Sequence, residues 1–250
     1  MTAEETVADY DVRSPASRTL MTVIGTIVAV VLVGGLVLGA SILKRDTTVS
    51  TSVVEVGGSA QLVIDAGAAD VRLVKGAEDV VRIRSRITSG LRKTEFQLGR
   101  RADEIKIAAA CQAWLSPGCG VSATLEIPEG LPVVVKTTTG DVVADSIVEG
   151  VLTVTSGSGD ISVRGIEVDE FSANTGSGDI RASFASQPFG FKAMTESGDI
   201  RAMVPTGERT YAITVKSDSG EVSNDLRSDR AGEGILRATT GSGDITLWSE

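Results

Sequence analysis

Six acidic side chains recur along the second half of the chain, and their spacing could support chemistry. They are Asp141, Asp160, Asp179, Asp199, Glu221 and Asp244, and successive members lie 19, 19, 20, 22 and 23 residues apart. A period of about 20 residues is typical of a solenoid, in which successive turns of the chain stack on one another. Stacking would place these carboxylates in a column with steps of about 4.8 Å, the spacing of neighbouring strands.

Such a column is open to three interpretations. Calcium takes oxygen ligands in varied geometry, so the carboxylates could bind a row of cations. Two carboxylates about 5–10 Å apart, such as Asp160 and Asp179, could act as the acid and base of a polysaccharide-cleaving enzyme. In the third interpretation the acid only bends the chain and bonds local N–H groups. We favour the third interpretation, because a catalytic pair needs two different environments and these acids all lie in the same local sequence motif.

The residues around each acid predict the strands that would position it. Large apolar residues stand eight positions before the acids: Val133, Leu152, Phe171, Phe191, Ile213 and Leu236. Smaller apolar residues stand six before, hydroxyls four and two before, glycine directly before, and a β-branched residue directly after. Steps of two share one face of a strand. We therefore expect an apolar interior, two internal hydroxyl ladders, a bend that uses the conformational freedom of glycine, and an external acid column.

Composition excludes several classes of function. The formal net charge of -9 and the lack of a basic stripe with interleaved aromatics argue against nucleic-acid binding. The chain has no histidine, which excludes Ser-His-Asp, Cys-His and histidine-ligated metal chemistry. We therefore predict a protein that is not an enzyme, with no catalytic residues and no cofactor, and calcium is the one possible ligand among cofactors.

The N-terminal part predicts a membrane anchor. Met1–Thr19 is polar and is expected to be a short disordered tail. Leu20–Leu43 carries no charged residue, and 24 residues of helix reach about 36 Å, enough to span a bilayer. A cleaved signal peptide is the alternative, but its apolar core would be unusually long. Gly35 and Gly39 form a GxxxG pattern, so a homodimer through this helix is also possible.

The two cysteines decide the predicted orientation, since basic residues flank both sides of the apolar segment equally. Cys111 and Cys119 bracket a short loop, which fits a disulfide formed in an oxidising compartment. We therefore expect a cytoplasmic N-terminus and an extracytoplasmic region from Asp46 to Glu250. Trp114 lies inside that loop and is the best candidate for a ligand contact, with packing over the end of the β region as the alternative.

The region beyond the membrane segment predicts an all-β, parallel β-helix or solenoid-like domain. Residues 46–130 are expected to form an irregular β cap or first coils, in which Asp70 ends a worn repeat unit, and residues 131–250 the regular repeats. Trp248 follows the last unit and is expected to cover the open end of the core.

The repeated S/T-G-x-S-G-D-[IV] phrase, the short tail and the single membrane helix resemble the bacterial "putative adhesin" family of unknown function. The resemblance covers residues 46–250 and implies a β-solenoid at the cell envelope. We expect a binding, adhesion-like or structural module whose partner is a cell-wall polymer, a glycan or an envelope protein. The alternatives are a polysaccharide-active enzyme and a calcium-dependent module.

Overall fold

The computed structural model is almost wholly β-strand. It describes residues 24, 26–35, 46–55, 61–77, 80–89, 95–101, 104–110 and 120–250. Residues 26–35 are helical, and no helix within the described ranges combines the length and apolarity needed to cross a membrane. The predicted tail, most of the Leu20–Leu43 segment with Gly39, and the loop that holds Cys111, Trp114 and Cys119 lie outside the described residues.

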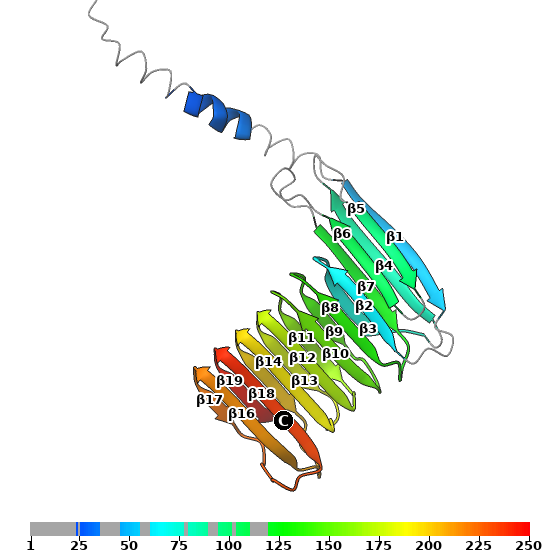
Figure 1. Ribbon diagram of the computed structural model, residues 1–250. Coiled ribbons are helices and arrows are strands. Elements are labelled where there is room, and N and C mark those ends of the chain that lie inside the picture. Colours follow the sequence, from blue (N-terminus) through cyan, green and yellow to red (C-terminus); the bar gives the residue numbers. More distant parts are fainter. Residues whose placement is uncertain are drawn as a thin grey trace, which may run out of the picture.

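The strands form two sheets (Figure 1). In spatial order the ten-stranded sheet contains β1 (Asp46–Glu55), β4 (Val80–Ser89), β7 (Gly120–Ile127), β3 (Asp70–Lys75), β9 (Val142–Asp145), β11 (Ile161–Ile166), β13 (Ile180–Phe184), β15 (Ile200–Val204), β19 (Ile245–Ser249) and β17 (Val222–Asn224). The nine-stranded sheet contains β16 (Tyr211–Ser219), β18 (Gly234–Ser242), β14 (Gly190–Ser197), β12 (Glu170–Ser177), β10 (Val151–Ser156), β8 (Val133–Thr137), β2 (Leu62–Gly67), β6 (Glu104–Ala110) and β5 (Glu95–Arg101).

Each repeat unit forms one rung, which is a strand of the nine-stranded sheet, a bend, and a strand of the ten-stranded sheet. Like positions stack in register, so that Leu152 pairs with Val133 on one side and with Phe171 on the other. The pairings are parallel except at the N-terminal end, where β1–β4, β4–β7 and β5–β6 are antiparallel. The predicted all-β class with mainly parallel, stacked strands is confirmed.

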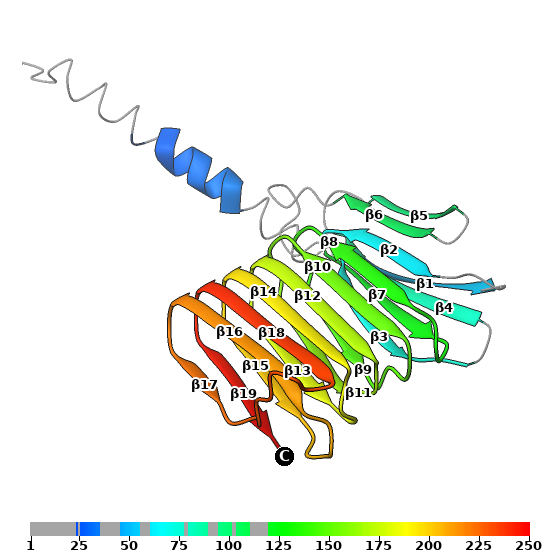
Figure 2. The same ribbon diagram turned by 60° about the horizontal axis from the view of Figure 1, so that its bottom comes forward.

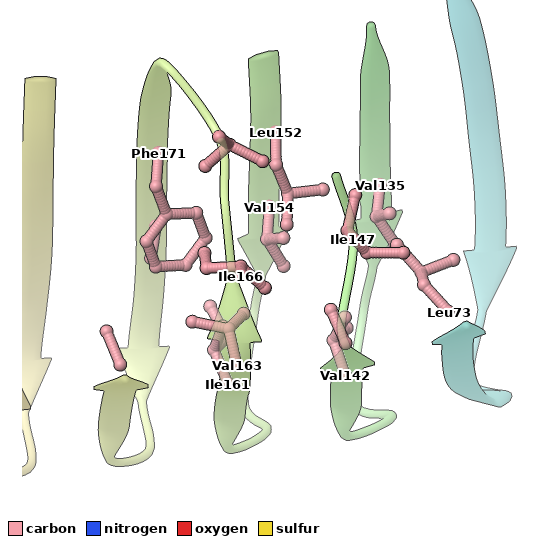
Figure 3. Close-up of a cluster of buried hydrophobic side chains, with 14 of the residues drawn as sticks. Leu73, Val135, Val142, Ile147, Leu152, Val154, Ile161, Val163, Ile166 and Phe171 are labelled. Carbon is pink, nitrogen blue, oxygen red and sulfur yellow. The ribbon is translucent and has the colours of Figure 1, made fainter. Parts of the chain in front are cut away.

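The apolar core lies between the two sheets, as Figure 3 shows for the middle rungs. Ile161 and Val163 leave the bend with a two-residue period, so both point inward and are at most 1% exposed. Phe171, Phe184 and Phe191 pack together with ring centroids 5.7–6.2 Å apart. Phe184, which lies at the end of β13, is therefore part of the core. Within the part of the chain that the structure describes, the buried hydrophobic residues lie between Leu62 and Leu247, so the region from Asp46 onward carries its own core.

The worn unit before Asp70 belongs to the stack, as the sequence predicts. Its strands β2 and β3 pair directly with β8 and β9 of the first regular unit. The intervening residues return beyond it as β4, β5, β6 and β7, and so extend the N-terminal end of both sheets.

The rungs do not stack in chain order at the C-terminal end, which corrects the expectation for Trp248. The last unit, β18 and β19, lies between β14–β15 on one side and β16–β17 on the other. Trp248 therefore pairs with Met203 inside the sheet instead of covering the open end. The rung at the end of the stack is the earlier unit 211–224, whose strands β16 and β17 lie at the left end in Figure 2.

Candidate functional site

The predicted acid column exists, and hydrogen bonds connect its members. Oδ1 of each aspartate accepts a hydrogen bond from the backbone N–H of the acid in the next rung, at 2.8–3.1 Å. In spatial order the column runs Asp70, Asp141, Asp160, Asp179, Asp199, Asp244 and Glu221. One carboxylate oxygen of every aspartate is therefore used to join two rungs.

Arginines balance part of the charge of the column. The Arg181 guanidinium contacts Oδ2 of Asp160 at 3.2 Å and Oδ2 of Asp179 at 2.5 Å, and Arg201 contacts Oδ2 of Asp199 at 2.7 Å. The side chains in these pairs are 29–48% exposed, so each ion pair contributes little to the free energy of folding, about 0–1 kcal/mol. The pairs do reduce the repulsion between stacked carboxylates.

Only one of the two predicted hydroxyl ladders is internal. The hydroxyls four positions before the acids donate to glycine carbonyls: Thr137, Ser156, Thr175, Thr195, Ser217 and Thr240. The hydroxyls two positions before the acids are exposed, which contradicts the prediction for Thr139, Ser158, Ser177, Ser197, Ser219 and Ser242. The two-residue period stops where the chain begins to bend, so those side chains leave the inner face.

The glycine before each acid is required mainly by close packing between rungs. A Cβ added at Gly140, Gly159 or Gly178 would lie 2.1–2.3 Å from a carbonyl oxygen of the preceding rung. Positive φ is present only at the later positions Gly198, Gly220 and Gly243. The prediction based on conformational freedom therefore explains only some of these glycines. The steric reason applies to all of them, since Gly198, Gly220 and Gly243 meet carbonyl oxygens at 2.0–2.1 Å.

The geometry of the column suits a structural role better than acid–base chemistry. Each interior aspartate uses Oδ1 in the same way, to accept the backbone N–H of the next rung, and neighbouring carboxylates differ only in their exposed arginine contacts through Oδ2. An acid and a base need more strongly different environments. Among the described residues, no cluster of three or more His, Cys, Asp or Glu side chains could hold a metal ion.

A hollow of about 610 Å³ lies where the chain skips a rung, and the sequence did not indicate it. Residues 205–210 cross from the end of β15 to β16, past the end of β19 at Ser249, and residues 225–227 line the opposite side. Arg209 is held there by Gln187, whose backbone carbonyl accepts from the guanidinium, and by the Phe189 ring, 3.7 Å below Cζ. Phe189 itself is 50% exposed.

Tyr211 forms the inner wall of this hollow. Its hydroxyl donates to the carbonyl of Pro188 at 3.0 Å, and the side chain is 3% exposed. Burial raises the pKa of Tyr211, while the neighbouring Arg209 acts in the opposite direction. The hollow carries arginines and carboxylates without a single dominant charge, so its lining does not select one ligand class.

Residues 129–248 match the Toastrack DUF4097 family. The Toastrack match covers the rungs from β8 to β19 and thus all six acids of the regular repeat. Two similar solved structures are a putative cell adhesion protein from Clostridium sporogenes and a putative adhesin from Bacteroides fragilis. The first has 11% identity and a TM-score of 0.52, and the match covers 82% of this chain and 100% of that chain.

The second has 12% identity and a TM-score of 0.43, and the match covers 80% of this chain and 97% of that chain. At 11% identity the Clostridium likeness shows the fold alone. No curated protein matches the chain.

Proposed function

We propose that this protein is a membrane-anchored, extracytoplasmic binding module of the cell envelope and that it does not act as an enzyme. The observation that carries this proposal is the use of the repeated polar groups. Each column aspartate joins one rung to the next through Oδ1, and the inner hydroxyls bond glycine carbonyls. The repeat thus builds a rigid stack, and its exterior faces are left for recognition. The adhesin names of similar structures agree with such a role.

The proposed anchor is Leu20–Leu43, with the N-terminus in the cytoplasm. It is supported by the uncharged length of that segment and by the cysteine pair at 111 and 119. C-terminal fusions to alkaline phosphatase and to green fluorescent protein test both points in a bacterial host. We expect membrane-bound phosphatase activity and a non-fluorescent second fusion. A fluorescent fusion, or a full-length protein in the soluble fraction, would refute the proposal.

Binding to envelope polymers is the proposed activity, with Trp114 as the proposed contact. Co-sedimentation of the fragment 46–250 with purified cell-wall sacculi tests it, and Trp114→Ala is compared with Phe189→Ala as a matched aromatic control. We expect Trp114→Ala to reduce the bound fraction and Phe189→Ala to leave it unchanged. If the parent fragment does not sediment, the proposed binding to the cell-wall polymer is refuted. If both variants bind like the parent, Trp114 is not the contact.

Calcium is the remaining alternative, and thermal melting decides it. We expect the same melting temperature with calcium and with chelator, because Oδ1 of each aspartate already accepts a backbone N–H. A rise of several degrees in calcium would show that the native state binds the ion, and the structural interpretation would then be wrong.

A further inference from the structure

The rung formed by residues 211–224 leaves both of its strands without a described neighbouring strand on one side. β16 ends the nine-stranded sheet and β17 ends the ten-stranded sheet, and we call this rung the open tip (Figure 2). At the inward positions of interior regular rungs, the apolar residues flanking the bend are at most 4% exposed. At the open tip, Ile213 and Val215 are half-buried and Val222 is 45% exposed. The end of the core therefore meets water.

The backbone of β16 also has unused hydrogen-bonding groups. Gly234 N–H donates to the Thr210 carbonyl at 3.1 Å, and in a parallel pair alternate residues bond to the same neighbour. The even-numbered residues of β16 up to Lys216 therefore bond to β18, and the odd-numbered residues from Tyr211 to Ser217 direct N–H and C=O to the open side. The Ser219 carbonyl instead accepts from Gly243 N–H, on the β18 side, at 2.9 Å. Asp229 N–H reaches only the first of these, the Tyr211 carbonyl, at 2.8 Å. From Ile213 to Ser217, no described strand pairs with this edge.

We propose that the open tip binds the open tip of a second copy of this chain, with β16 paired antiparallel to its counterpart across a two-fold axis. A two-fold contact brings one surface onto itself, so both copies lose the same exposed edge at once. An axis perpendicular to the sheet keeps the inner faces on the same side. The apolar interiors of the two stacks then become continuous, whereas a single extended peptide would complete one sheet and leave the interior open.

The pattern of β16 defines the register of this pairing. With Val215 opposite its counterpart, the free edge from Ile213 to Ser217 overlaps the same residues of the second copy. The ends of the strand stay outside the pairing, because Ser228 already bridges to Tyr211. The hydrogen-bonded pairs then fall on Ile213, Val215 and Ser217, whose N–H and C=O groups face the open side. Ile213 lies opposite Ser217, and Lys216 lies opposite Thr214. No like charges are directly opposed, so the pairing avoids the cost that like-charge pairs impose on a sheet.

The size of the tip indicates a weak dimer. A nine-residue strand is about 30 Å long, and two packed sheets with their side chains are roughly 20 Å across, so the end face of the tip offers at most about 600 Å² per copy. The total of about 1,200 Å² is at the lower limit for a specific interface. The tip lies at the opposite end of the stack from β1, which follows the apolar segment. The dimer would therefore join two copies end to end, away from their proposed anchors.

Sedimentation equilibrium of the fragment 46–250 tests this proposal, since the fragment contains the whole core. We expect a monomer–dimer equilibrium with a Kd between about 10 and 100 µM, as an interface of this size allows. Val215→Lys should leave a monomer across that range, because the long side chain reaches water in the monomer but not in the dimer. Val215→Pro removes one outward N–H and should also abolish the dimer, while circular dichroism confirms the native strand content.

Val53→Lys on β1, the edge at the other end of the ten-stranded sheet, is the matched control and should dimerise like the parent. A parent fragment that stays monomeric at 200 µM would overturn the proposal. So would a dimer that survives Val215→Pro or that is lost in Val53→Lys. The test is independent of the proposed anchor, because the fragment lacks residues 1–45. A failed fusion assay and a failed dimer are therefore separate results.

Discussion

Replacing one acid in the middle of the column measures how strongly the carboxylates join the rungs. In Asp179→Ala the N–H of Asp199 loses the acceptor that now lies 2.9 Å away in a partly buried position. An unsatisfied N–H of this kind costs about 1–3 kcal/mol. The lost ion pair with Arg181 adds at most about 1 kcal/mol because both partners are partly exposed. We therefore expect the free energy of unfolding to fall by about 2 kcal/mol.

Urea denaturation of the fragment 46–250, followed by circular dichroism, measures this loss. A domain of this size should have an m-value of about 2–3 kcal/mol/M, so the midpoint should fall by about 0.7–1 M. Asp179→Asn keeps an acceptor oxygen and should lose less than half as much. Glu221→Ala is the matched control, because Glu221 ends the column and its carboxylate bonds to no described residue. Its midpoint should stay within about 0.2 M of the parent.

Two results would refute this reasoning. Equal losses in Asp179→Ala and Glu221→Ala would show that the acid acts only through its own bend and not through the next rung. An Asp179→Asn variant as unstable as Asp179→Ala would show that the charge matters and not the acceptor oxygen, which would return a cation to consideration.

Four further predictions concern other parts of the chain. Ile180→Asp should abolish the cooperative melting transition, because the side chain is fully buried and an unpaired charge there costs several kcal/mol; a parental melt would contradict the inward register. Truncation after Glu233 removes β18 and β19, so hydrogen exchange should show that 211–224 loses its protection while β12–β13 keeps it; slow exchange in both segments would contradict this. The stability contributed by Tyr211 should be complete below about pH 10 and lost as the pH rises through its raised pKa, so Tyr211→Phe should flatten the alkaline fall in melting temperature. If Cys111 and Cys119 are joined, reduction should lower the free energy of unfolding by about 2–3 kcal/mol, and the melting temperature should fall with it. Free thiols detected before reduction would exclude the bond.

The repeat alone predicted much of the stack. Large and small apolar residues at two-residue steps indicated the inner face, and the positions occupied by Leu152 and Val154 are indeed buried. The same reasoning failed two positions before each acid, because a period belongs to a straight strand and the chain has begun to turn there. The sequence predicts that glycine is needed directly before each acid. The main cause is a carbonyl oxygen of a neighbouring rung, which no local sequence pattern reports.

The order of the rungs at the C-terminal end could not be predicted from the repeated sequence motif. Units around Asp199, Glu221 and Asp244 present the same inward pattern, so each can pair with any of the others. What separates the observed order from the consecutive one is the path of two connections, residues 205–210 and 225–233, whose length alone permits either arrangement. The hollow around Arg209 escaped prediction for the same reason, since it exists only because one connection passes over the end of β19.

The inverted rung order has a consequence for how the protein is made. A solenoid that stacks in chain order can add each rung as soon as the ribosome or the translocation channel releases it. Here the unit 211–224 has no described partner strand until the segment that forms β18 and β19 follows. The final two rungs must therefore form together, after the whole chain is available. A chain that ends prematurely would retain a stack only to β15, with its end uncovered, and proteases recognise such exposed ends in incomplete copies.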